Sequence, residues 1–289
     1  MESDRPEPAD SPYEPPRLEP PRLGPPRPEP PRLEPAHLGA TERVPDSVKE
    51  RRSRHGGVDL LVGIALIWAF EIAVGVAIFV WFLATHGAGD PQRVQEEFAA
   101  FATSPGGMLL MFLVASSWML AVIWFLACRR YRLSFGAGFA LRPLRAPSLL
   151  TWVTVGAAAG VALEFVLQPF STGESMMAEI TSTPEGLWTV TVVALIAPFT
   201  EELYYRGFIF PVLREKMGVG PAVTLTSLWF AAVHAPQVAG DWAALPAIYV
   251  MGLLWTLQRQ ISGSLVPSIV THLAYNATIM TLAHLIGAD

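Results

Sequence analysis

From residue 58 onward, long apolar stretches alternate with short polar connections, whereas residues 1–57 are polar and rich in proline. A helix needs about 20 residues to cross the hydrocarbon of a bilayer, and most of the stretches reach that length. Charged residues make up only 16% of the chain, compared with about 25% in soluble domains. The pattern predicts an all-α protein, a polytopic transmembrane bundle of about seven helices behind a polar tail. The expected spans are 58–84, 106–127, 148–169, 186–210, 220–236, 243–258 and 264–286.

Basic residues recur in alternate connections, and this sets the expected orientation. KERRSRH at 49–55 precedes the first span, and RRYRLSFGAGFALRPLR at 129–145 carries five arginines, whereas the first and third connections are mainly acidic. The positive-inside rule then places the N-terminus in the cytoplasm. The alanine- and arginine-rich, lysine-poor composition is typical of high-GC bacteria, so we expect a bacterial plasma membrane. The surroundings are the lipid bilayer, and no nucleic-acid partner is expected.

The N-terminal segment contains an internal repeat. EPPRL occurs at 14–18, 19–23 and 29–33. Such a density of proline disfavours helix and sheet and favours polyproline II. We expect residues 1–57 to be a disordered cytoplasmic tail, with 58–289 as the membrane-embedded domain. A docking segment for a partner that reads proline motifs is the alternative reading of the repeat.

Three charged residues lie within the fourth apolar span. A charge at the centre of a membrane helix costs about 2.5–3.5 kcal/mol on insertion scales, so it needs a partner or water. Glu202 and Arg206 are four residues apart on one helix face and can neutralise each other. Glu201 is turned about 100° away from Glu202. The spacing therefore predicts one compensated glutamate and one that is free for chemistry.

Two later spans carry further polar side chains at helical spacing. Phe230 and His234 are four residues apart in the fifth span, and His272 and Asn276 are four apart in the seventh. Intramembrane ionisable groups tend to face one polar cavity. Glutamate and histidine together suit the activation of water, whereas the single cysteine, Cys128, excludes a multi-cysteine metal site. The inventory favours hydrolysis inside a membrane cavity.

The ordered set of motifs resembles the CPBP family of intramembrane proteases, which includes type II CAAX prenyl endopeptidases and bacteriocin-processing or self-immunity proteins. The motifs are Glu-Glu-x-x-x-Arg, Phe-x-x-x-His and His-x-x-x-Asn, each in a separate span. They stand here as Glu201–Arg206, Phe230–His234 and His272–Asn276. The resemblance covers about 185–286. Members of the family often have eight spans rather than seven.

The resemblance implies an endopeptidase that cleaves a membrane-anchored peptide or protein. Glu201 would be the base that activates water, and His234 would help to position that water. His272 and Asn276 would line the oxyanion side of the site. The natural substrate cannot be read from these residues.

The resemblance also raises the question of a metal. Glu201, His234 and His272 can form a two-histidine, one-carboxylate zinc site with an open position. The same residues can equally act on water without a metal. In both cases Glu202 and Arg206 would support the site.

Two readings of another class accompany the protease. A non-enzymatic immunity or scaffold protein of the same family would need no turnover. A transporter or proton relay could also use glutamate and histidine. Transporters usually contain inverted repeats, and no second copy of the motifs is present in the sequence.

Overall fold

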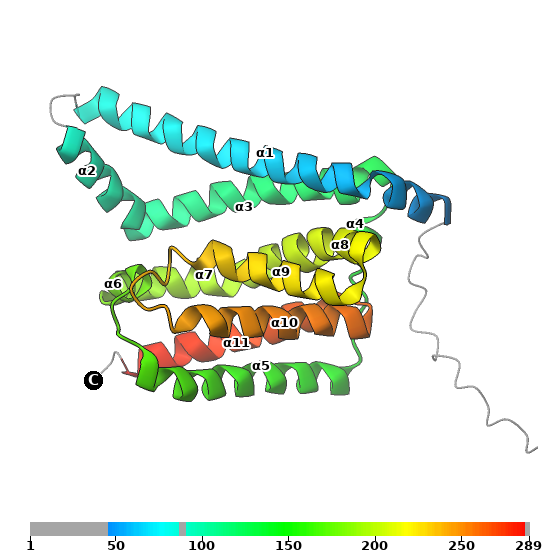
Figure 1. Ribbon diagram of the computed structural model, residues 1–289. Coiled ribbons are helices and arrows are strands. Elements are labelled where there is room, and N and C mark those ends of the chain that lie inside the picture. The colour runs from blue at the N-terminus through cyan, green and yellow to red at the C-terminus, as the bar shows by residue number, and fades with distance from the viewer. Residues whose placement is uncertain (1–45, 87–90, 287–289) are drawn as a thin grey trace, which may run out of the picture. The chain divides into compact units, whose positions relative to one another are not determined.

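The computed structural model describes residues 46–86 and 91–286, and helices are the only regular elements in these ranges (Figure 1). This confirms the all-α fold class. The longer helices are α1 (Asp46–His86), α2 (Pro91–Thr103), α3 (Pro105–Ala127), α5 (Ala146–Leu167), α7 (Pro184–Glu202), α9 (Val219–His234), α10 (Ala244–Ser262) and α11 (Val266–Ile286). Shorter elements are η1 (Arg129–Tyr131), α4 (Phe135–Phe139), η2 (Gln168–Phe170), α6 (Met176–Thr181), the π-helix η3 (Leu203–Ile209) and α8 (Phe210–Met217).

A helix covers each of the seven apolar stretches, but the count of seven membrane spans is not confirmed. Four segments of the described chain are long and apolar enough to cross a bilayer: Arg54–Thr85, Pro105–Tyr131, Ser148–Phe170 and Pro184–Met217. Helix α9 has only 16 residues. Helices α10 and α11 are longer but contain buried polar residues such as Thr256, Gln258, Ser268 and Thr271. These side chains lower the hydropathy of the helices that surround the interior.

Helix α1 begins well before the expected start of the first span. It starts at Asp46, directly after Pro45, so residues 46–57 are helical and the expected tail boundary at 57 is wrong. Ion pairs one turn apart stabilise this exposed part, from Lys49 to Asp46 (2.7 Å) and from Arg54 to Glu50 (2.7 Å). The proline-rich repeats lie outside the described residues.

Helices α5 and α11 pack closely side by side (Figure 1, green and red). Gly156 and Gly160, one turn apart on α5, face α11. A Cβ atom on Gly156 would lie 2.3 Å from the carbonyl oxygen of Thr271, and one on Gly160 would lie 3.1 Å from Thr278. This small-xxx-small pair permits the close packing of the two helices, and the packing fixes the helix that carries His272.

We expect Gly156→Ala to destabilise the protein, because the new methyl group cannot fit without moving α5 away from α11. Overpacking of this kind typically costs about 1–3 kcal/mol. Gly75→Ala on α1 is the matched control, since a Cβ atom there meets nothing within 4 Å. Thermal unfolding in detergent measures both variants. Equal melting temperatures for the two variants would contradict the close contact.

Candidate active site

Helix α7 carries the two glutamates, and its ends are defined by local sequence. The Thr183 side chain accepts a hydrogen bond from the Gly186 N–H (3.1 Å), and Pro184 occupies the first helical turn. Both are common at helix N-termini. The helix then runs through apolar residues to Glu201 and Glu202 at its C-terminal end.

A π-helix, η3, follows Glu202 directly, where the sequence predicted an uninterrupted α-helix to 210. Its wider turn is visible at the end, where the Phe210 N–H donates to the Tyr205 carbonyl five residues earlier. Every residue of η3 is buried. π-Helical turns are rare and frequently occur at functional sites. The change of helix type thus falls at the charged residues.

Glu202 and Arg206 form the expected ion pair, in the interior. Arg206 Nη1 lies 2.9 Å from Glu202 Oε1, and both side chains are 0% exposed. Arg206 also donates from Nε to Thr256 Oγ1 (3.1 Å) and from Nη2 to the Gly252 carbonyl (3.1 Å). The ring of Phe230 lies 4.6 Å from the guanidinium carbon. The buried cation is therefore matched by a carboxylate, a hydroxyl, a carbonyl and an aromatic face.

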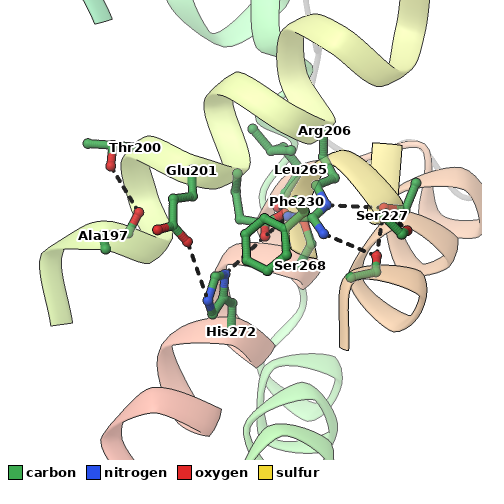
Figure 2. A network of polar contacts seen from close by, with 12 residues as sticks. Ala197, Thr200, Glu201, Arg206, Ser227, Phe230, Leu265, Ser268 and His272 are labelled. Carbon is green, nitrogen blue, oxygen red and sulfur yellow. Dashed lines mark hydrogen bonds and ion pairs between the residues drawn. The ribbon is translucent and has the colours of Figure 1, made fainter. Parts of the chain in front are cut away.

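His272 from α11 contacts the same glutamate. Its Nδ1 lies 3.0 Å from Glu202 Oε1 (Figure 2). A carboxylate paired with Arg206 can only accept, so Nδ1 carries the hydrogen and the neutral ring has an acceptor at Nε2. The Trp255 ring stacks on the imidazole at 3.5 Å between centroids. Glu202 and Trp255 together fix the orientation of His272.

His234 at the end of α9 is oriented by its own helix. Its Nδ1 lies 2.7 Å from the carbonyl oxygen of Phe230. Because a carbonyl can only accept, Nδ1 donates, and Nε2 of the neutral ring is again an acceptor. Phe230 therefore serves twice: its carbonyl orients His234, and its ring covers Arg206.

Both histidine rings present Nε2 to Glu201. Glu201 Oε2 lies 3.7 Å from His272 Nε2, and Glu201 Oε1 lies 3.9 Å from His234 Nε2. These distances are too long for direct hydrogen bonds but short enough for one bridging species. The Glu201 side chain is 23% exposed, unlike the enclosed Glu202. The structure thus brings three acceptors from three helices to one accessible point.

Asn276 contacts α7 at a different place. Pro198 has no N–H, so the carbonyl of Ala194, four residues earlier, lacks its helical donor. Asn276 Nδ2 donates to this carbonyl at 2.8 Å. Among the described residues, Asn276 makes no polar contact with Glu201, His234 or His272. The structure places it as a tie between α11 and α7, one helical turn past His272.

The sequence interpretation did not include three residues of α10 that complete the site. Gly252 and Thr256 accept from Arg206, and Trp255 stacks on His272. Their spacing of three and four residues puts them on one helix face. The sequence signal for these three residues is a glycine, a hydroxyl and an aromatic residue on one face of α10. It was missed because the search for site residues looked for ionisable side chains.

The site was also compared with the requirements of zinc. Two imidazole nitrogens and a carboxylate are donors of the right chemical type. In the described part of the chain, however, no group of three or more histidine, cysteine, aspartate or glutamate side chains is arranged to hold a metal ion. A zinc role for Glu201, His234 and His272 therefore stays a prediction.

Comparison with known families agrees with these motifs. Residues 183–278 match the family described as Type II CAAX prenyl endopeptidase Rce1-like. This segment, a third of the chain, is therefore similar to the Rce1-like family. This confirms the resemblance to CPBP proteins, and the Rce1-like segment (residues 183–278) contains all six predicted site residues.

A curated relative extends the similarity beyond the Rce1-like segment. An uncharacterised 24.3 kDa protein of Escherichia coli is 28% identical over 199 residues, which cover 66% of this chain and 88% of that protein. No solved structure matches the chain. The family and the apolar helices together identify an integral membrane protein.

Within the Rce1-like segment, we expect Arg206→Ala to lower folded yield and melting temperature strongly. It leaves Glu202 buried without its cation, which costs about 3–5 kcal/mol for pairs of this kind. Glu202→Gln should cost less, because the amide oxygen can still accept from Arg206.

The control is Arg93→Ala, which removes an exposed pair with Glu97 at the same four-residue spacing. Exposed pairs are worth about 0–1 kcal/mol. If Arg206→Ala were as stable as Arg93→Ala, the Glu202–Arg206 pair would have to be solvated.

Proposed function

We propose that the protein is an intramembrane endopeptidase that hydrolyses a peptide bond in a membrane-anchored peptide or protein. The observation that carries this proposal is the convergence of Glu201 Oε1 and Oε2 with the Nε2 atoms of two histidines. Three acceptors at this separation match a species that supplies hydrogens to them, and water is such a species. The family description, a CAAX prenyl endopeptidase, supports the same reaction class.

In the proposed mechanism, Glu201 takes a proton from water as the water oxygen bonds to the substrate carbonyl carbon. Water has two hydrogens, so while one goes to Glu201 the other is donated to Nε2 of His234, and His272 holds its ring against the opposite oxygen of Glu201. When the tetrahedral intermediate collapses, the C–N bond breaks and Glu201 returns the proton to the leaving amine. An asparagine amide has two N–H groups, so Asn276 has one left for the oxyanion after its bond to Ala194.

Glu202 and Arg206 act as positioning residues. Glu202 holds Nδ1 of His272, and Arg206 holds Glu202 in turn. This relay fixes the imidazole so that Nε2, rather than Nδ1, faces Glu201. The partial exposure of Glu201 gives water access, while the buried pair keeps its geometry during turnover.

The proposed cellular setting follows from the same chain. The substrate is membrane-anchored because the site lies within apolar helices, and the location is the plasma membrane of a bacterium with the N-terminus in the cytoplasm. Comparative proteomics of membranes with active and Glu201→Gln protein would identify the natural substrate as peptides that accumulate uncleaved.

We expect Glu201→Gln to reduce peptide cleavage by about 10²–10⁴-fold, because the base is lost while the side chain keeps its shape. His234→Ala and His272→Ala should be comparably inactive. Asn276→Ala should be milder, since one oxyanion donor is worth about 10²–10³-fold.

Glu185→Gln, in the first turn of α7, makes the same chemical change at an exposed position and serves as the control. Cleavage by purified protein is measured alongside thermal unfolding, which shows that each variant is folded. A folded Glu201→Gln protein with normal cleavage would remove this mechanism and leave the immunity or scaffold role.

We propose the metal-independent form of this reaction, in which the three acceptors hold water rather than Zn²⁺. Purified protein should keep its cleavage rate after treatment with a strong chelator, and elemental analysis should find less than one zinc per chain. Loss of activity with chelator, its recovery with Zn²⁺, and lower zinc content in the two histidine variants would instead assign Glu201, His234 and His272 as ligands.

A further inference from the structure

A cavity of about 660 Å³ with a mixed polar and apolar lining lies among the helix ends. Its walls come from the start of α1, the connection 128–145, the end of η3 with α8, and the end of α10. None of the six predicted site residues lines it. The cavity is therefore distinct from the residues proposed to carry out proteolysis.

Basic side chains outnumber acidic side chains in the lining of the cavity. Four cations from four separate segments face the cavity: Lys49, Arg142, Arg214 and Arg259. Two acids, Asp59 and Glu215, also line it. Asp59 is nearly buried and already pairs with Arg130 Nε (3.1 Å) and accepts from the Tyr131 hydroxyl. Lys49 is paired with Asp46 outside the lining (2.7 Å), so one remaining acid, Glu215, stands against three arginines, which favours an anionic ligand.

The rest of the lining suits a ligand that is partly apolar. The backbone of Gly56, Gly136, Gly138 and Gly207 forms part of the wall. Apolar side chains form other parts of the wall, including Leu126, Phe208 and Val212. A charged headgroup can thus contact the arginines while its glycerol and first chain carbons contact the apolar wall.

We propose that this cavity binds the phosphate headgroup of an anionic phospholipid. Arg142 and Arg214 lie near the ends of two candidate membrane segments, Ser148–Phe170 and Pro184–Met217, and the ends of a span are where it meets the lipid headgroups. Basic pockets of this kind between membrane helices hold anionic headgroups, with about 1 kcal/mol from each Lys or Arg near the surface. The proposal does not depend on proteolysis, since it uses none of the catalytic side chains.

The test titrates full-length protein in detergent with dioctanoyl phosphatidylglycerol and, separately, with zwitterionic dioctanoyl phosphatidylcholine. Binding is followed by the rise in melting temperature. The double variant Arg142→Gln/Arg214→Gln removes two exposed cations of the lining. The control is the single variant Arg93→Gln, which changes an exposed arginine of α2 outside the cavity.

We expect phosphatidylglycerol to stabilise wild type and Arg93→Gln at lower concentration than phosphatidylcholine does. The double variant should bind phosphatidylglycerol roughly 30-fold more weakly, with an unchanged response to phosphatidylcholine. Equal responses to the two lipids, or full phosphatidylglycerol binding by the double variant, would overturn the proposal. A third arm uses inorganic phosphate: if phosphate alone gives the whole shift and the lipid adds nothing, the ligand is a free anion and the lipid assignment is wrong.

Discussion

The burial of the Glu202–Arg206 pair is the constraint on which the rest of the site depends. Both side chains are fully enclosed, and a buried charge without partners would cost several kcal/mol. Each remaining donor of Arg206 must therefore meet an acceptor, and α10 supplies two in Thr256 and the Gly252 carbonyl. Glu202 also receives His272 from α11. The need to satisfy one ion pair thus fixes the relative positions of α7, α10 and α11.

This constraint separates two adjacent glutamates into different roles. Glu202 is committed to Arg206 and His272 and is closed to solvent, whereas Glu201 keeps 23% of its side chain exposed. His272 lies between them, with Nδ1 on Glu202 and Nε2 toward Glu201. The structural carboxylate thereby sets the orientation of a ring that the accessible carboxylate uses. Such a division requires the two acids to be neighbours in sequence.

The sequence predicted the parts of this arrangement that depend on spacing within one helix. Residues four apart share a face, so the Glu202–Arg206 pair and the separate position of Glu201 could be inferred without a structure. The contributions of Gly252 and Trp255 could not, because a backbone carbonyl and a stacked ring leave no charge pattern in the sequence. The early start of α1 was missed because polar residues at 46–57 hide a helix held by exposed ion pairs. The hydrogen bond from Asn276 to Ala194 was missed because it depends on another helix. There Pro198 has no N–H and leaves the Ala194 carbonyl without its helical donor.

The π-helical turn limits how the chain length can vary. Across η3, hydrogen bonds join residues five apart, as from Phe210 to Tyr205, so this segment holds more residues than an α-helix with the same number of turns. Removal of one residue between 203 and 209 would allow an ordinary α-helix to form. The wide turn would absorb the loss, so α7 and α8 would keep nearly the same register while the residues inside η3 change position, including Gly207, where a Cβ atom would lie 2.8 Å from Phe139. Along this stretch a substitution changes one contact, whereas a single-residue insertion or deletion changes all of them together.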